Sequence, residues 1–383
     1  MKVIHVTSGL GVKSGGPSRS VFNLVKHLRE EGLDAEIVTM NHIDNPNISD
    51  APFIKSFDVK RSLPFGLNFK FGSFLGRHLG DIFHIQSIYT YATIIAAWIA
   101  QRKGIPYIVA PRGMLYANAL KHNAGRKKVF NKLFLIRDLN KAAAIHVTCK
   151  EEMRQVRDAG VTAPVAIIPN SISIPEVLPT VCKKDKFRVG FLGRINSIKN
   201  IDGLLRAWDM AGLGKREDLE LVIVGGTNLA EEASYLDELH KLESERSITN
   251  IVWKGALYGE EKDKVLETLS CMVLCSHSEN FGMSVVEAML YGIPVIAAKT
   301  TPWSELNEFK CGWWVDNDDR TLSEALQKAV SLSDAEWLEM ATNGQQIAVK
   351  NYSAKTLSQN LIQLYQWVLE GGMEPEFVYK INE

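Results

Sequence analysis

The sequence contains no run of eighteen apolar residues, the length that a membrane-spanning helix needs. The apolar stretch at its start, 1–6, is short, and glycines soon interrupt it, so a secretory signal peptide is not expected. Cysteine is also scarce. The five cysteines are an odd number without the spacing of a metal site, which favours a protein of the reduced cytoplasm.

Net charge is absent as well, because 44 Lys and Arg balance 44 Asp and Glu. This balance hides an asymmetry between the two halves of the chain. Residues 1–170 carry 23 Lys and Arg against 12 Asp and Glu, a net of +11, which leaves −11 for the remainder. A basic half predicts an anionic surface or ligand as a partner. Nucleic acid is not the expected partner.

The length of 383 residues is sufficient for two domains, and the composition, 46% hydrophobic and 23% charged, is ordinary for a globular protein. Apolar runs alternate with amphipathic helical patterns, which predicts an α/β fold with parallel sheets. Prolines and charges over 171–186 indicate a linker between domains at 1–170 and 187–352, with a last helix and tail at 353–383. Residues 41–80, rich in Asn, Pro, Phe and Lys, are expected to be irregular loops.

The most informative stretch is 278–296, which lies between two apolar runs that read as buried parallel strands, 271–275 and 293–297. It should form a loop and a short helix. Glu279 falls on the loop, at the carboxyl end of a strand, and Glu287 falls about one turn inside the helix. Ligands of open α/β sheets bind at this edge, and the start of a helix suits a phosphate. The stretch therefore predicts an anion site flanked by two acceptors for sugar hydroxyls.

Each carboxylate also has a structural interpretation. Ser284 and Glu287 have the S-x-x-E spacing of a capping box, which would make Glu287 a device for starting the helix. Glu279 taken alone is most simply a solvated acid on a loop.

Glycine-rich and cationic loops follow other predicted strands. The loop at 9–17 is neither a P-loop nor a G-x-G-x-x-G fingerprint and could be a tight turn. Arg112 follows the strand at 105–110, where it could bind a phosphate or a hydroxyl. Arg194 and Lys199 lie on a strand-to-helix loop and are well placed for a diphosphate, although as surface cations alone they would mean little.

The spacing Glu279-x7-Glu287, together with the Gly-x-Pro-Val-Ile sequence at 292–296, resembles the signature of the retaining glycosyltransferases of family 4, which have the GT-B fold. Pro-Arg-Gly-Met-Leu at 111–115 also resembles a motif of this family, which often has His where this chain has Arg112. The resemblance covers nearly the whole chain. It implies two Rossmann-like domains that face each other across a cleft, with a C-terminal helix crossing back onto the first.

Residue roles follow from the resemblance. Arg194 and Lys199 would stabilise the leaving nucleotide diphosphate, and Glu279 would hold hydroxyls of the donor sugar; these three are the predicted catalytic residues. Glu287 would bind the ribose. The resemblance implies no metal and no cofactor beyond the nucleotide-sugar substrate. The predicted nucleotide-sugar-binding residues are Gly15, Gly16, Arg112, Leu257, Phe281, Gly282, Met283, Ser284 and Glu287.

The activity implied is the transfer of a hexose from a UDP or GDP sugar to a hydroxyl acceptor, with retention of configuration. The acceptor would be a glycan or a lipid-linked glycan, in the synthesis of bacterial surface polysaccharide or lipopolysaccharide. Two other functions stay open. One is a non-catalytic nucleotide-sugar binding protein, and the other is a nucleotide-sugar epimerase or a phosphorylase-like enzyme.

A last expectation concerns the membrane. Basic residues and apolar residues interleave over 116–141, which is typical of an interfacial amphipathic helix, and equally of a solvated charged face over a buried stripe. Under the first interpretation the protein is cytoplasmic and docks peripherally on the anionic inner face of the cytoplasmic membrane.

Overall fold

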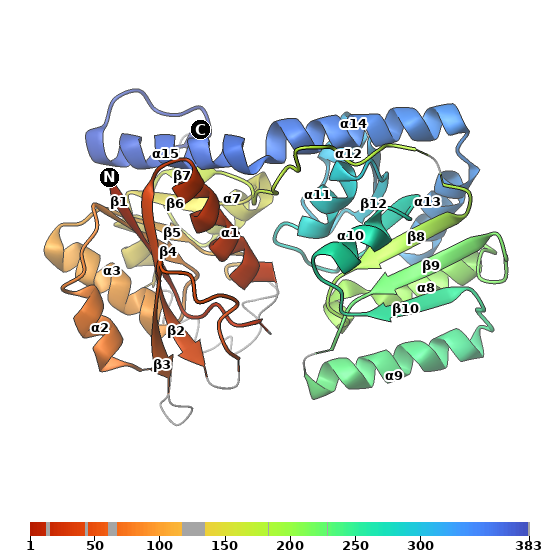
Figure 1. Cartoon of the computed structure of the whole chain (residues 1–383), viewed down its shortest axis with the longest axis horizontal. Coiled ribbons are helices and arrows are strands. Elements are labelled where there is room, and N and C mark those ends of the chain that lie inside the picture. Colours follow the sequence, from red (N-terminus) through yellow and green to blue (C-terminus); the bar gives the residue numbers. More distant parts are fainter. Residues whose placement is uncertain are drawn as a thin grey trace. The chain divides into compact units, whose positions relative to one another are not determined.

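The computed structural model describes residues 1–12, 16–42, 45–59, 67–116, 135–182, 184–227 and 229–381. They form two units, Met1–Ser171 with Ala354–Glu383, and Ile172–Ser353 (Figure 1). The segment expected to be a linker, 171–186, belongs almost entirely to the second unit. Gln345 Nε2 donates to the Pro179 carbonyl there over 2.8 Å, and the Val181 side chain packs against Gly292.

The first unit contains an eight-stranded sheet in the order β14-β7-β6-β5-β4-β1-β2-β3, in which β14 alone is antiparallel. The inner strands β1, β4, β5 and β6 are almost fully buried, because helices cover both faces of the sheet, and this explains their continuous apolar sequences. Their bounds are β1 Lys2–Thr7, β2 Asp34–His42, β3 Ile54–Val59, β4 Ile82–Gln86, β5 Tyr107–Ala110, β6 Ala144–Val147, β7 Val165–Ile167 and β14 Val378–Tyr379.

The helices of the first unit divide between the two faces of its sheet. On one face pack α2 (Phe69–Leu75), α3 (Tyr91–Lys103), α6 (Ile136–Asn140) and α7 (Lys150–Asp158). On the other face lies α1 (Gly16–Glu30), whose buried stripe contains Val21, Leu24, Val25 and Leu28.

The expectation that 41–80 would be irregular is wrong, because this region contains β3 and α2. The strand β3 is an edge strand with mostly exposed side chains, so it lacks an apolar run. The helix α2 has only seven residues and starts at Asn68, whose side chain accepts a hydrogen bond from the Phe71 N–H.

The second unit contains a parallel six-stranded sheet in the order β10-β9-β8-β11-β12-β13. The chain moves from β8 outward to β9 and β10, then returns to β11 on the other side of β8. This makes β8 and β11 the topological switch point, where ligands of open α/β sheets bind. The strands are β8 Phe187–Leu192, β9 Leu219–Val224, β10 Ile251–Gly255, β11 Cys271–Leu274, β12 Val295–Ala298 and β13 Gly312–Val315.

Helices cover both faces of this sheet too. The core of one face includes α8 (Ile201–Met210), α9 (Ala230–Glu245) and α13 (Asp319–Ser331). The core of the other includes α11 (Met283–Leu290), α12 (Glu305–Glu308) and α14 (Asp334–Tyr352). The remaining helices are the short α10 (Glu260–Leu266) and the 3-10 helix η4 (Ser197–Lys199).

The last helix, α15 (Ala354–Glu370), belongs to the first unit, so the predicted return of the C-terminal helix is confirmed. It packs beside α1 (Figure 1), and its side chains Leu357, Leu361, Leu364 and Tyr365 enter the core of that face. No helix among the residues that the structure describes is long and apolar enough to cross a membrane.

The docking of α15 can be tested with Leu361, which is fully buried. Leu361→Ala should lower the free energy of unfolding by about 2–5 kcal/mol, because it removes buried methyl groups and leaves a cavity. Gln363→Ala, at an exposed position of the same helix, is the matched control and should change stability by about 0.5 kcal/mol or less. Equal effects of the two substitutions in chemical denaturation would contradict the packing of α15.

Candidate functional site

Two loops at the switch point of the second unit bring Lys199 and Glu279 together. Lys199 ends η4, after β8, and Glu279 lies on the loop between β11 and α11. The Lys199 Nζ forms an ion pair with Glu279 Oε2, and both side chains are less than one-fifth exposed. The Ser276 hydroxyl donates to the same carboxylate oxygen over 3.3 Å. Two of the three predicted catalytic residues thus form a cation and an acceptor in contact, at the strand ends where a ligand is expected.

Further bonds fix these loops to one another. The backbone N–H of His277 donates to the Ile198 carbonyl over 2.7 Å, and the Cys275 thiol donates to the carbonyls of Lys199 and Asn200, each over 3.3 Å. Asn200 adopts a left-handed backbone conformation, with a φ of 54°, between η4 and α8. The Lys199–Glu279 pair therefore rests on a rigid support.

The start of α11 depends on Gly282, which has a φ of 87°. A Cβ at this position would lie 2.7 Å from the Leu274 side chain. Glycine is therefore required both by the left-handed backbone conformation and by the lack of space for a side chain. The preceding carbonyl, that of Phe281, accepts a hydrogen bond from the buried Trp303 indole over 2.5 Å. No described residue accepts a hydrogen bond from the backbone N–H of Met283 or Ser284. These two donors at a helix N-terminus are suited to an anion.

Glu287 lies one turn inside α11, as predicted, but the capping-box interpretation is wrong. The helix begins at Met283 with Gly282 as its N-cap, so Ser284 is already inside the helix and cannot cap it. The Glu287 carboxylate instead pairs with Lys262 of α10, 2.8 Å away, and both side chains are about one-quarter exposed. Glu287 is thus a partly accessible acceptor rather than a device for starting the helix.

Arg194 lies on the loop after β8 and its side chain is half exposed. The Glu232 carboxylate, at 3.6 Å, is too far for more than a weak ion pair. The loop itself is held by the Gly193 N–H, which donates to the Val224 carbonyl over 3.0 Å. Leu257, on the loop after β10, is half-buried against the core beneath α11.

Carboxylates near this edge have other roles. Asp316 and Asp318 follow β13, and Asp316 pairs with Lys299 over 2.9 Å, whereas Asp318 caps α13 through the Thr321 N–H. Among the described ranges there is no group of three or more His, Cys, Asp or Glu side chains that could hold a metal ion.

The predicted site residues of the first unit are Gly15, Gly16 and Arg112, and their surroundings in the structure differ. Gly15 lies outside the described residues. Gly16 is the exposed first residue of α1, and a Cβ there would meet nothing within 4 Å. Arg112 follows β5 with a left-handed φ of 55°, and its guanidinium donates to Gln86 Oε1 (2.7 and 3.0 Å) and to Asn170 Oδ1 (2.9 Å). The structure thus fixes Arg112 in the sheet edge by neutral acceptors.

Behind Arg112 runs a continuous chain of hydrogen bonds that the sequence did not predict. Its direction is set by its two ends, because a guanidinium can only donate and a carbonyl can only accept. Donors and acceptors therefore alternate in one sense along the chain. The bonds run from Arg112 to Gln86 Oε1, from Gln86 Nε2 to His5 Nδ1 (3.2 Å), from His5 Nε2 to Tyr365 Oη (3.5 Å), from Tyr365 Oη to His84 Nδ1 (2.7 Å), from His84 Nε2 to His146 Nδ1 (3.2 Å) and from His146 Nε2 to the Ile168 carbonyl (2.8 Å).

The three histidines of this chain are neutral. Burial, helped by the Arg112 charge, lowers the pKa of His5 and of His146 to about 3. Burial and the neighbouring histidines also hold the pKa of His84 well below its ordinary value. A second proton on any of these rings would turn its acceptor nitrogen into a donor. Two donors would then face each other, and one hydrogen bond of the chain would be lost. The chain links α15, through Tyr365, to the orientation of Arg112.

His84 is a fully buried core residue. His5, Gln86, His146 and Tyr365 are the residues that sequence reasoning missed. A signal existed. His5, His84 and His146 each lie one or two residues before the carboxyl end of a strand, and the parallel register places His5 directly beside His84.

Comparisons with known proteins bear on this geometry. Residues 15–171 match the model "Glycosyl transferase 4-like domain", and residues 179–346 match "Glycosyl transferases group 1". A GDP-mannose-dependent alpha-mannosyltransferase of Corynebacterium glutamicum is 32% identical over 47% of this chain and 40% of its own length. A 41.2 kDa protein of the cps region of Klebsiella pneumoniae is 23% identical over 75% of this chain and 78% of its own.

The fold is also that of solved structures. The HepE protein of Anabaena, crystallised with UDP-glucose, superposes with a TM-score of 0.73 at 17% identity, over 95% of this chain and 99% of its own. The architecture is the GT-B fold of glycosyltransferases. The chain belongs to the glycosyltransferase group 1 family, family 4, as its two matched models together show. The match spans less than half of the Corynebacterium relative's length.

The neutral histidines make stability depend on pH. Their pKa values are lowered in the folded state, so below pH 6.5 the unfolded chain binds more protons and folding is progressively disfavoured. Stability should be full above pH 6.5 and should fall by about 1.4 kcal/mol per histidine for each pH unit below it. His146→Gln can still donate and accept a hydrogen bond. In denaturation measured between pH 4 and 6, this variant's free energy of unfolding should change less steeply with pH than the parent's, by the contribution of about one histidine. The exposed control His240→Gln should not. An unchanged slope for His146→Gln would show that His146 is not held neutral.

Proposed function

We propose that this protein transfers a sugar from a nucleoside diphosphate sugar to a hydroxyl acceptor with retention of configuration. The observation that carries the proposal is the Lys199–Glu279 pair beside the free N–H groups that start α11. A cation, an acceptor and a helix N-terminus at one point of a sheet edge can bind a diphosphate and the sugar attached to it. Family membership and the titles of the relatives, which include GDP-mannose and UDP-glucose, support a nucleotide-sugar donor.

Catalysis then consists of stabilising the negative charge that develops on the departing diphosphate. Lys199 and the half-exposed Arg194 would bind its oxygens, together with the N–H groups of Met283 and Ser284. Such preorganised donors act most strongly where charge appears only in the transition state. Because Glu279 neutralises Lys199 before the donor binds, the arriving diphosphate would take over Lys199.

The released Glu279 carboxylate would accept hydrogen bonds from hydroxyls of the donor sugar, next to the Ser276 hydroxyl. Glu287, which pairs with Lys262, would accept hydrogen bonds from the ribose hydroxyls. The nucleobase would lie against the loop that carries Leu257, and UDP and GDP are both compatible with this role. Phe281 and Gly282 would act through the position of α11 rather than by contact.

We assign the first unit to the acceptor, with Arg112 as the cation at its sheet edge and the loop of Gly15 and Gly16 approaching the donor phosphates. In the mechanism we favour, the departing phosphate helps to deprotonate the acceptor on the same face of the sugar. This mechanism involves no enzyme nucleophile and no metal. A non-catalytic nucleotide-sugar binding protein is the competing proposal, and donor hydrolysis without acceptor separates the two.

The acceptor we propose is a growing bacterial surface glycan, free or lipid-linked. The relative from the cps region of Klebsiella pneumoniae supports this class, since it matches three-quarters of each chain. The enzyme would work in the cytoplasm, where nucleotide sugars are made, and bind the inner membrane face peripherally. The basic segment 116–141 suggested this contact, and its residues 117–134 lie outside the described part of the chain.

Arg194→Ala and Lys199→Ala should each lower kcat/KM on the order of 10²–10³-fold, because each removes a preorganised positive charge from the leaving group. The fold should persist, since neither side chain is part of a core. Arg216→Ala, which breaks an exposed pair with Asp218, is the charge-matched control and should retain activity. If either site variant turned over like the parent at saturating donor, the diphosphate assignment would be wrong.

Glu287→Gln should weaken binding of the nucleoside diphosphate about tenfold, since a charge-assisted acceptor for the ribose is lost. Lys262→Gln breaks the same ion pair but leaves the carboxylate in place, so it should bind nucleotide at least as tightly as the parent. Titration calorimetry compares the two. Equal weakening in both variants would mean that the ion pair matters to the structure and that Glu287 does not bind the ribose.

A further inference from the structure

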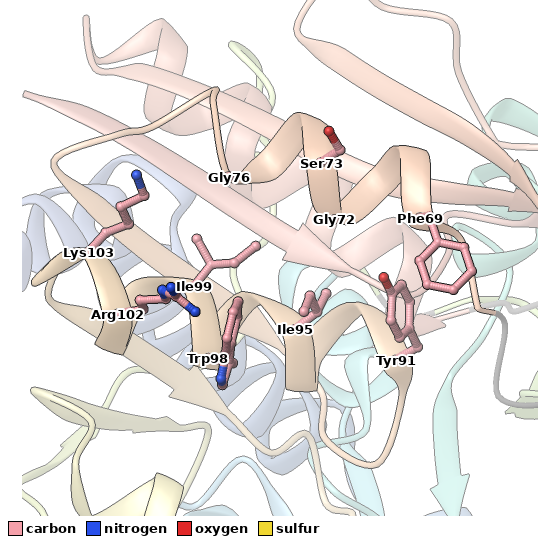
Figure 2. A pocket seen from close by; sticks show the side chains of 10 residues that line it. All are labelled: Phe69, Gly72, Ser73, Gly76, Tyr91, Ile95, Trp98, Ile99, Arg102 and Lys103. Carbon is pink, nitrogen blue, oxygen red and sulfur yellow. The ribbon is translucent and has the colours of Figure 1, made fainter.

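A groove of about 320 Å³ runs between α2 and α3 on the first unit (Figure 2). Its lining is mainly apolar, with Ile95 and Ile99 of α3 on one side and Gly72 and Gly76 of α2 on the other. A Cβ at Gly72 would lie 3.0 Å from the Tyr91 hydroxyl. A side chain at Gly72 would therefore narrow the groove. Its apolar lining suits a chain of methylene groups.

Large apolar side chains beside this α2–α3 groove are exposed to solvent. The Phe69 side chain is 82% exposed and Trp98 is 52% exposed, although neither is needed to close a core. Neighbouring Ile94, on α3, is 41% exposed. Aromatic side chains gathered at the rim of an apolar groove indicate contact with an apolar partner. Trp in particular is favoured at the boundary between lipid and water.

One end of the groove is cationic. Arg102 and Lys103, in the last turn of α3, lie at the end opposite Phe69 and Tyr91 (Figure 2). The Arg102 guanidinium lies 5.1 Å from the Trp98 ring. No residue lining the groove is acidic, and no carboxylate in the described part of the chain pairs with either cation. This end is complementary to an anionic group.

One end of the groove lies near the carboxyl ends of the sheet's parallel strands, and the other lies near their amino ends. The helix α3 follows the carboxyl end of β4 and returns to the amino end of β5, so Tyr91 is near the edge that carries Arg112. Arg102 and Lys103 are near the other edge. An anion bound there would be far from the residues assigned to sugar transfer.

We propose that the α2–α3 groove holds one hydrocarbon chain of an anionic bilayer lipid, with its phosphate against Arg102 and Lys103, with Trp98 beside that head group at the lipid–water boundary and with Phe69 at the far end of the chain. The lipid acts as an anchor and not as the sugar acceptor, because its head group lies at the sheet edge away from Arg112. This site is independent of the proposed transfer, and lipid binding is measured without turnover. Failure of one does not affect the other.

The test uses vesicles of phosphatidylglycerol and phosphatidylcholine, compared with phosphatidylcholine alone. The protein should co-sediment with the anionic vesicles and not with the neutral ones. Lipids brominated along the chain should quench the Trp98 emission, obtained as the difference between the parent and Trp98→Phe. The double variant Arg102→Gln/Lys103→Gln should partition about 30-fold less strongly, or about 2 kcal/mol for two charges near an anionic surface. Lys215→Gln/Lys328→Gln removes two exposed charges from the second unit and should bind like the parent.

Ser73→Phe introduces a ring into the groove from the exposed side of α2 and should abolish the quenching. Circular dichroism checks that each variant is folded. If Ser73→Phe does not fold, the double charge variant still tests the proposal, because its two substitutions are on the surface. Unquenched Trp98 on bound protein would overturn the proposal. So would equal recovery on both vesicle types, no recovery on either, or a dimer in sedimentation that Phe69→Ser dissolves, since a second copy would then be the occupant.

Discussion

The ion pair between Lys199 and Glu279 is the interaction on which the candidate site depends. It joins the loops after β8 and β11, which are neighbouring strands at the point where the strand order reverses. Each charge is satisfied by the other, so neither is left unpaired where exposure to solvent is low. A diphosphate competes for the lysine and a sugar hydroxyl for the carboxylate. Binding of a complete donor can therefore replace the pair, whereas either half of the donor would leave one charge without its partner.

The first unit holds its cation by a contrasting arrangement. Arg112 is oriented by the neutral oxygens of Gln86 and Asn170, and Gln86 is in turn oriented by His5 and Tyr365. Its positive charge is therefore not cancelled by a carboxylate in direct contact. The nearby buried Glu152 accepts from the Gly113 and Thr148 N–H groups instead, and burial raises the pKa of that carboxyl group. An arginine fixed in this way keeps its attraction for an anion.

Sequence patterns predicted the architecture well because its determinants are local. Buried parallel strands read as apolar runs, and α1 carries a clear 3.6-residue stripe. The edge strand β3 was missed because only one of its side chains is buried, and periodicity cannot detect a strand that packs so little. At the site, the spacing placed Glu279 and Glu287 correctly on a loop and a helix. It could not identify Lys262 as the partner of Glu287, since that contact comes from another helix and leaves no trace in local spacing.

A crystal structure of the protein with a bound nucleoside diphosphate sugar, the complete donor, would test the central claim most directly. The account predicts diphosphate oxygens within hydrogen-bond distance of Lys199, Arg194 and the N–H groups of Met283 and Ser284, with the Lys199–Glu279 pair opened and the ribose on Glu287. A nucleotide bound elsewhere, or bound at α11 with Lys199 still paired to Glu279, would contradict it.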